Sequence, residues 1–214
     1  MTLKLNEIFY SIQGESTYAG YPCIFIRLAG CNLRCSYCDT TYAYDEGEDV
    51  AVEKIIDTIS SYKCRLIEIT GGEPLLQAET PALIRKLLDK NYRVLLETNG
   101  TLDTGSVDAR CIKIMDIKCP SSGEEGKNNF LNLSKFTERD EIKFVIGTRD
   151  DYVYAKKILP LLQGNSLIQH IHFSPAKEMI LPSTLSAWIL EDSLDVRLNL
   201  QLHKIIWPLD QRGV

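Results

Sequence analysis

The chain has 214 residues, a net charge of −5 and 44% hydrophobic residues, which is the composition of a single globular domain spanning residues 1–214. No apolar run approaches the ~20 residues of a membrane-spanning helix. Nucleic-acid binding draws on clustered Lys and Arg, and the net negative charge of this chain argues against it. These features favour a small-molecule ligand and argue against a membrane or nucleic-acid partner.

The cysteine content indicates a compartment. There are seven cysteines, an odd number, and the first residues lack the apolar core of a signal peptide. Disulfides are rare in reducing compartments. We therefore expect a cytoplasmic protein whose thiols are free or bind a metal.

The first third of the chain predicts two strands and a helix. Residues 5–10 and 23–28 are strand-like, and the second run is apolar apart from one arginine. The acidic residues 45–49 predict a solvated loop. Apolar residues then recur at i, i+3, i+4 and i+7 across 52–59, the pattern of an amphipathic helix.

The rest of the chain alternates in the same way. A Gly/Ser-rich loop is predicted at 121–129. Because strands alternate with helices, we expect a parallel α/β sheet with right-handed crossovers. About six such units are present, fewer than the eight of a closed barrel. Strands are predicted at 66–70, 94–96, 112–117, 142–146, 168–173 and 196–200, and helices at 83–88, 152–162 and 185–190.

Three cysteines lie close together in a polar loop after the second strand. Cys31, Cys35 and Cys38 form a C-x-x-x-C-x-x-C motif, and a thiolate triad this close can hold a soft metal centre. Structural zinc almost always takes four protein ligands, yet the next candidates, Cys64 and His170, are distant in sequence. Three thiolates fit a 4Fe–4S cluster with one iron left open, a departure from the usual four cysteines.

Polar residues also gather where the predicted strands end. In parallel α/β folds the site lies at the carboxyl ends of the strands, so we expect one active site. Glycine at 71 and 72 would permit close approach of a ligand, and Glu73 would add an acceptor for a cation. The strand-end residues are Arg27, Thr70, Glu73, Glu97, Asn99, Asp116, Lys118, Ser174, Gln201 and His203.

The cysteine loop, with Tyr37 before the third cysteine, resembles the cluster motif of the radical S-adenosylmethionine (radical SAM) enzymes, and the Gly-Gly-Glu-Pro of 71–74 resembles their cofactor motif. The resemblance implies a partial (β/α)6-type barrel with parallel strands and abridged helices. It also implies a 4Fe–4S cluster on Cys31, Cys35 and Cys38 as the catalytic centre. The implied S-adenosylmethionine-binding residues are Tyr37, Cys38, Asp39, Gly72, Glu73, Asp116, Ile117, Lys118 and Ser174.

Within that superfamily, residues 7–204 resemble the 7-carboxy-7-deazaguanine synthase family, through 12–15 (Ile-Gln-Gly-Glu), Arg27, 38–40, 97–100 and 201–204. The resemblance implies a lyase of queuosine and related deazapurine biosynthesis. It would take a hydrogen from C6 of 6-carboxy-5,6,7,8-tetrahydropterin and contract the ring to 7-carboxy-7-deazaguanine, with loss of ammonia. The implied substrate-binding residues are Ile12, Gln13, Gly14, Glu15, Arg27, Thr70, Glu97, Asn99, Gln201 and His203.

The same resemblance implies further partners. Thr40 would help to hold Mg²⁺, a flavodoxin or ferredoxin would supply electrons, and the protein would be a homodimer. In the family the chain terminus approaches the substrate. Residues 205–214 form a longer tail here, which leaves the role of Val214 open.

Arg27 is the only charged residue of its strand. An unpaired buried charge is costly, so an anion should meet it. The substrate carboxylate suits its planar fork, and a protein carboxylate such as Glu15 or Glu97 is the alternative.

Two other functions compete with this interpretation. Another radical SAM enzyme, such as a glycyl-radical activase, would share the cysteine motif. A non-enzymatic iron–sulfur or zinc module would not need the converging polar residues. We expect packing roles for the remaining thiols, for two histidines of a predicted strand and for one tryptophan. These residues are Cys23, Cys64, Cys111, Cys119, His170, His172 and Trp188.

Overall fold

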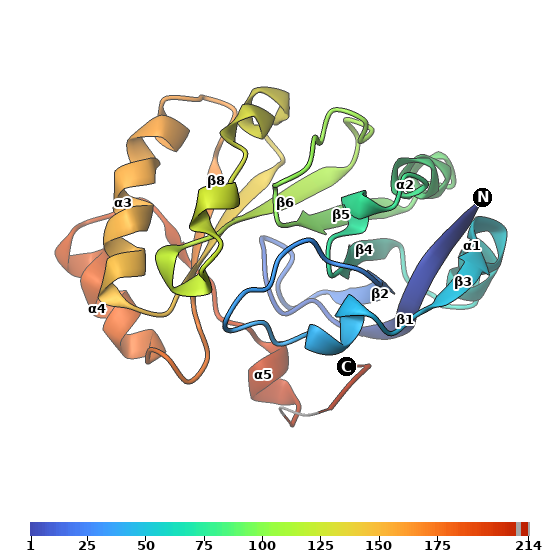
Figure 1. The fold of residues 1–214 in the computed structure, drawn as a ribbon, viewed down its shortest axis with the longest axis horizontal. Coiled ribbons are helices and arrows are strands. Elements are labelled where there is room, and N and C mark those ends of the chain that lie inside the picture. Colours follow the sequence, from blue (N-terminus) through green and yellow to red (C-terminus); the bar gives the residue numbers. More distant parts are fainter. Residues whose placement is uncertain (209–210, 214) are drawn as a thin grey trace.

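The computed structural model describes residues 1–208 and 211–213, and their strands form one curved sheet (Figure 1). The strand order is β3-β1-β2-β4-β5-β6-β7-β8-β9. β1 (Thr2–Ile12) is antiparallel to both β2 (Pro22–Leu28) and β3 (Glu48–Ala51). All later pairings are parallel, which confirms the expected α/β partial barrel.

Helices cover the outer face of the sheet unevenly. Figure 1 shows α1 and α2 beside the first strands and α3 and α4 at the opposite end. No α-helix is assigned between β5 and β6 or between β6 and β7, where the described chain forms loops and short 3₁₀ turns. The strands are β4 (Leu66–Gly71), β5 (Arg93–Thr98), β6 (Ile112–Ile117), β7 (Glu141–Ile146), β8 (His170–Pro175) and β9 (Arg197–Leu198), and the helices are α1 (Val52–Ser60), α2 (Thr80–Asp89), α3 (Arg149–Gln163), α4 (Pro182–Glu191) and α5 (His203–Ile206).

Two apolar clusters hold the helices to the sheet. Ile55 on α1 and Leu83 on α2 pack against the outer faces of β2, β4 and β5. Tyr152 on α3 packs against Phe144 and Phe173 of the later strands. Each fully buried side chain of this kind contributes about 1.5–3 kcal/mol. Because the outer face carries this core, the inner face can carry polar groups.

Some elements differ from the sequence prediction. The predicted solvated loop at 45–49 is wrong in its second half, since β3 begins at Glu48 and pairs with β1. Edge strands tolerate charged side chains, so acidity does not exclude a strand there. α3 begins earlier than predicted because Thr148 and Asp151 form a capping box. β9 is shorter than the predicted strand at 196–200.

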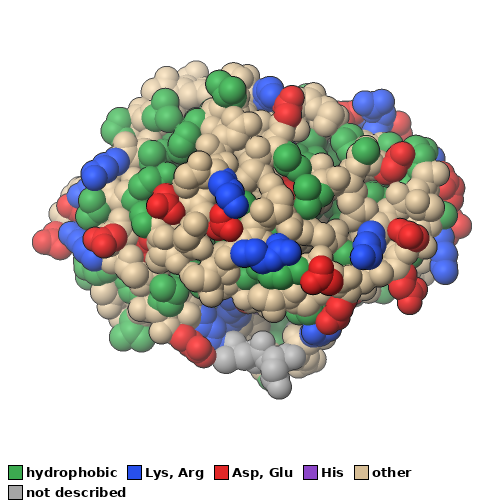
Figure 2. Space-filling view, viewed as in Figure 1, with side chains coloured by type: hydrophobic (Ala, Val, Ile, Leu, Met, Phe, Trp, Pro, Cys, Tyr) green, Lys and Arg blue, Asp and Glu red, His purple; other side chains and the backbone are tan. Residues whose placement is uncertain are grey.

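On the face drawn in Figure 2, basic and acidic side chains are interspersed, and no large area is of one sign. None of the described helices has the length and apolar character needed to cross a membrane.

Candidate active site

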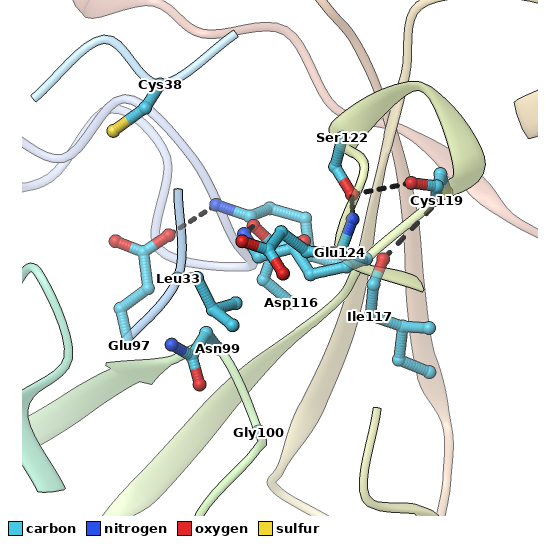
Figure 3. Close-up of polar contacts among 12 residues, drawn as sticks. Leu33, Cys38, Glu97, Asn99, Gly100, Asp116, Ile117, Cys119, Ser122 and Glu124 are labelled. Carbon is cyan, nitrogen blue, oxygen red and sulfur yellow. Dashed lines mark hydrogen bonds and ion pairs between the residues drawn. The ribbon is translucent and has the colours of Figure 1, made fainter. Parts of the chain in front are cut away.

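A cavity of about 710 Å³ opens on the inner side of the barrel. Most of the residues predicted for the site line it, whereas Glu73, Ile117 and Ser174 do not. Figure 3 shows Cys38, Glu97, Asn99 and Asp116 in this region. The predicted residues on its wall are Ile12, Gln13, Gly14, Glu15, Arg27, Cys31, Cys35, Tyr37, Cys38, Asp39, Thr40, Thr70, Gly72, Glu97, Asn99, Asp116, Lys118, Gln201 and His203.

The cysteine loop begins where β2 ends and is held by backbone contacts. Gly30 has φ +96°, which directs the chain away from the sheet, and its N–H donates to Ala43 O at 2.8 Å. Arg34 N donates to Glu124 Oε1 at 2.6 Å, and Ser36 N donates to Ser122 O at 3.1 Å. The loop is therefore fixed to two neighbouring segments.

The three thiols of this loop are half-buried and face the cavity. Among the residues that the structure describes, no three Cys, His, Asp or Glu side chains converge on a point where one ion could sit. A 4Fe–4S cluster does not need such convergence, because each cysteine binds a different iron. The loop thus fits the cluster better than a single zinc ion.

Charge around the thiols also fits a cluster. Burial raises the pKa of the Cys31 and Cys35 thiols, and the nearby Lys118 ammonium opposes that rise. Leu33 N donates to Cys31 Sγ at 3.4 Å. A cation and an N–H group directed at sulfur favour the thiolate form that binds iron.

The glycine pair packs directly against the cysteine loop. A Cβ on Gly71, whose φ is +143°, would lie 2.0 Å from Leu28 O. A Cβ on Gly72 would lie 2.1 Å from Gly30 O. Real Cβ atoms cannot approach so closely, so the two glycines are required where this turn meets the loop.

Glu73 organises the next loop rather than facing the cavity. Its side chain is fully buried and accepts hydrogen bonds from Asn99 N at 2.7 Å and Leu75 N at 3.0 Å. Thr98 Oγ1 also donates to it at 2.9 Å. Burial raises the pKa of Glu73 against the effect of these donors. In the structure the Glu73 carboxylate accepts from protein N–H and O–H groups, and its role as an acceptor for a cation stays a prediction.

The end of β6 contributes an ion pair to the wall. Lys118 Nζ lies 2.8 Å from Asp116 Oδ2. Asp116 Oδ1 and Tyr37 OH are buried without a hydrogen-bond partner among the described residues. Such atoms are rare in folded proteins, and a ligand beside the cysteine loop would give them partners.

Ile117 and Ser174 lie just outside the cavity. Ile117 points to the outer core because successive residues of a strand face opposite sides. Ser174 is buried and accepts a hydrogen bond from Asn199 Nδ2 at 3.0 Å.

A buried lysine that the sequence analysis missed connects several predicted residues. Lys143 on β7 is 5% exposed, and its ammonium contacts Glu97 and lies 3.1 Å from Glu15 Oε2. Burial acts to raise the pKa of Glu97, but the charge and hydrogen bond of Lys143, together with the hydrogen bond from Thr70, lower it. A lone cation in an apolar strand, the signal that identified Arg27, could have identified Lys143 as well.

Arg27 contacts the carboxylate of Glu7, a residue outside the predicted site. Its Nε lies 2.7 Å from Glu7 Oε1, directly across the β1–β2 pair. The guanidinium carbon also lies 5.5 Å from the Phe9 ring centroid and 5.8 Å from that of Tyr42. Among the described residues, none accepts a hydrogen bond from the two terminal nitrogens of Arg27. The protein carboxylate that contacts Arg27 is therefore Glu7 and not Glu15 or Glu97, and the contact with a substrate carboxylate stays a prediction.

The segments after β1 and after β9 meet at the cavity. Leu202 N donates to Gly14 O at 3.0 Å, and a Cβ on Gly14 would lie 2.2 Å from His203 Nδ1. Lys204 Nζ lies 2.5 Å from Asp39 Oδ2, which lowers the pKa of Asp39 although burial acts to raise it. These contacts join the segment after β9 to the loops that follow β1 and β2.

Part of the chain after 204 also lines the cavity. Arg212 stacks 3.8 Å from the Tyr42 ring centroid, and its Nη1 lies 3.0 Å from Glu46 Oε2. Trp207 joins the wall. Val214 lies outside the described residues, so the structure does not address its contact with a substrate.

The residues expected to have packing roles lie away from the cavity wall. Cys23, Cys111 and Cys119 are buried, and Cys64 is half-buried. His172 Nε2 lies 2.7 Å from Glu141 Oε2. His170 and Trp188 are partly buried.

Known proteins resemble this chain in sequence and in fold. Residues 25–164 match the family model of the radical SAM superfamily. A 7-carboxy-7-deazaguanine synthase of Chlorobaculum tepidum is 45% identical over 99% of this chain and 97% of its own length. One from Koribacter versatilis is 41% identical over 99% and 100%.

Two solved structures share the fold. The crystal structure of QueE from Escherichia coli superposes with a TM-score of 0.79 at 24% identity and covers 94% of each chain. Streptococcus suis SuiB bound to S-adenosylmethionine gives 0.55 at 12% identity, over 78% of this chain and 44% of that one.

Proposed function

The chain belongs to the 7-carboxy-7-deazaguanine synthase family of the radical SAM superfamily, and we propose that it contracts the ring of 6-carboxy-5,6,7,8-tetrahydropterin to 7-carboxy-7-deazaguanine with loss of ammonia. This would be a step of queuosine biosynthesis. One observation carries the proposal: a single cavity joins the cysteine loop to the substrate-binding segments. The relatives give no support to a glycyl-radical activase.

When bound, a 4Fe–4S cluster and S-adenosylmethionine would supply the radical that starts this chemistry. Cys31, Cys35 and Cys38 would hold the cluster. The backbone from 37 to 39 would border the adenine, and Gly72 would lie beside the methionyl amino group. Asp116 and Lys118 would reach the cofactor directly, and the orphaned Asp116 Oδ1 and Tyr37 OH support a ligand there. Glu73, Ile117 and Ser174 would shape this region from behind.

Arg27 would bind the substrate carboxylate through the two terminal nitrogens that Glu7 leaves free. Its Nε is held by Glu7, so the fork is oriented before substrate arrives. Lys143 keeps Glu97 ionised and also contacts Glu15, which suits both side chains to accept from the N–H groups of a pterin. The remaining wall would be Ile12, Gln13, Gly14, Thr70, Asn99, Gln201 and His203.

Thr40 would help to hold Mg²⁺. Its hydroxyl lies at the cavity, 3.8 Å from Cys38 Sγ. Magnesium takes oxygen ligands and keeps several waters, so one hydroxyl suffices if the substrate adds another oxygen.

Residues 1–214 would act as one domain, with electrons from a flavodoxin or ferredoxin. We expect a cytoplasmic homodimer by analogy with the family. The net charge of −5 continues to disfavour a nucleic-acid partner.

The proposal is tested by anaerobic incubation of reconstituted protein with S-adenosylmethionine, a reductant and the carboxytetrahydropterin. Mass spectrometry should find 7-carboxy-7-deazaguanine, with ammonia released in equal amount. Cleavage of S-adenosylmethionine without the ring-contracted product would favour a different radical SAM reaction.

A further inference from the structure

Glu68 is an acidic residue of the cavity that has no role in the site described so far. It lies on β4 two residues before Thr70, so both side chains point to the same face of the sheet. It is 5% exposed and lines the cavity beside Phe25, its neighbour in register on β2. Gln13 directly follows β1, close to the start of β2. We term Gln13, Phe25 and Glu68 the cavity floor.

Glu15, Glu68 and Glu97 form a group of carboxyl side chains at the cavity, and one oxygen of Glu68 differs from the others in its hydrogen bonding. Among the described residues, Oε1 of Glu68 has no hydrogen-bond partner, although it is not sealed from the cavity. Every other carboxyl oxygen of Glu15, Glu68 and Glu97 accepts from a protein donor. Those donors are Lys143 and Gln201 to Glu15, Lys143 and Thr70 to Glu97, and Gln13 to Oε2 of Glu68.

The charge balance around Glu68 disfavours its ionised form. Lys143 is shared between Glu15 and Glu97, and among the described residues no cation contacts Glu68. On the neighbouring strand β2, the titratable side chains on the same face are the Cys23 thiol and the Arg27 guanidinium, and Arg27 is paired with Glu7. Burial first, and then the charge of Glu97, raises the pKa of Glu68 well above its usual value, against the effect of Lys143.

The position of the proton follows from Gln13. Its Oε1 accepts from Glu15 N at 2.9 Å, so its amide nitrogen is the group that faces Glu68. That nitrogen donates to Oε2 of Glu68. A proton on the carboxyl must then sit on Oε1, the oxygen that opens into the cavity.

We propose that Glu68 is a neutral carboxylic acid that donates a hydrogen bond from Oε1 to an acceptor of the bound pterin, and so acts as a specificity-determining residue. The pterin is taken from the proposed function. A pterin carries a ring carbonyl beside its N–H groups, and only the neutral form of a carboxyl can donate to that carbonyl. Glu97, ionised beside Lys143, and Glu15 complement this by accepting from the N–H groups.

The test compares Glu68→Gln, which keeps the shape and a donor, with Glu68→Leu, which removes both polar atoms. Anaerobic calorimetry at pH 7 would measure binding of 6-carboxy-5,6,7,8-tetrahydropterin to the reconstituted proteins with S-adenosylmethionine present. We expect Glu68→Leu to raise the Kd roughly 10-fold or more, as for an unsatisfied buried hydrogen bond, and Glu68→Gln to stay within about threefold of the parent protein. Cluster absorption of all three proteins would check folding.

Infrared difference spectra of parent protein minus Glu68→Gln, without substrate, would detect the proton itself. The carbonyl band of a neutral carboxylic acid should be present at pH 7. Absence of that band, equal affinity in all three proteins, or Glu68→Gln as weak as Glu68→Leu would each overturn the proposal. If the parent protein failed to bind the pterin, the proposed function and this substrate contact would both be rejected, and the infrared band would still decide the state of Glu68.

Discussion

Gly72 packs against Cys31 so closely that a Cβ on Gly72 would lie 2.7 Å from the Cβ of Cys31. The close contact therefore fixes the position of the glycine turn relative to the cysteine loop. The contact continues in the backbone, where Glu73 N donates to Gly30 O at 2.8 Å. Gly72 and Cys31 are 41 residues apart along the chain, but the two motifs form one structural unit beside the cavity.

We expect Gly72→Ala to lower the iron–sulfur content of the reconstituted protein severely, because its Cβ would also lie 2.1 Å from Gly30 O and would displace the loop. Iron analysis and the visible absorption of the cluster measure the loss. Gly126→Ala is the matched control, since a Cβ there would meet nothing within 4 Å. A Gly72→Ala protein with full cluster content would show that the loop can move without loss of the site.

Alanine substitutions should distinguish the cysteines that hold the cluster from those that do not. Alanine at Cys31, Cys35 or Cys38 should abolish the 4Fe–4S spectrum and turnover, because each thiolate would hold its own iron. Cys64→Ala should spare both, since Cys64 lies off the cavity wall. Electron paramagnetic resonance of the reduced proteins would show the difference. A normal cluster in Cys35→Ala would contradict the assignment.

Arg27→Ala should weaken substrate binding by about 1.5–3 kcal/mol, the range for a charged hydrogen bond, while leaving cluster content nearly intact. Glu7→Gln should have a smaller effect, because Nε of Arg27 keeps an oxygen acceptor and the terminal nitrogens are unchanged. Calorimetric titration with the carboxytetrahydropterin compares the two variants. Undiminished affinity of Arg27→Ala would make Arg27 a structural partner of Glu7 alone.

Lys143→Met should destabilise the fold by about 1–3 kcal/mol at pH 7, because it leaves the partly buried carboxylates of Glu15 and Glu97 without their cation. Lys143 lowers the pKa of Glu97, so this interaction stabilises the native state above the normal pKa of a glutamate and is lost as the pH falls through the depressed one. The variant should therefore lose less stability than the parent protein on acidification. Chemical denaturation at several pH values measures both effects, and identical pH profiles would contradict the ion-pair account.

Thr40→Val tests the proposed magnesium contact. Activity of the parent protein should rise on adding Mg²⁺, and the variant should lose that response because a methyl group cannot act as an oxygen ligand. Initial rates across a magnesium titration compare them. An equal response in both proteins would remove Thr40 from the metal site.

The sequence allowed much of this site to be predicted, because motifs such as 71–74 follow strands whose carboxyl ends meet. The sequence did not reveal the residues that reach the site only through the pairing register of the strands. Lys143 becomes part of the site only because β7 aligns it with Asp116 on β6. Glu7 reaches Arg27 only because β1 and β2 are antiparallel, whereas alternation had suggested parallel strands throughout.

Glu68 and β3 show the same limit. The sequence around Glu68 does not indicate which other carboxyl groups lie near it in the fold. The acidic run that forms β3 at the edge of the sheet has the composition of a loop. Both depend on contacts between distant segments.

The central claim is that the cysteine loop and the substrate segments form one site for a radical ring contraction. A single anaerobic turnover with substrate carrying deuterium at C6 tests it most directly. The account predicts deuterium in 5′-deoxyadenosine together with 7-carboxy-7-deazaguanine as product. Cleavage of S-adenosylmethionine that leaves 5′-deoxyadenosine without deuterium and the pterin unchanged would contradict it.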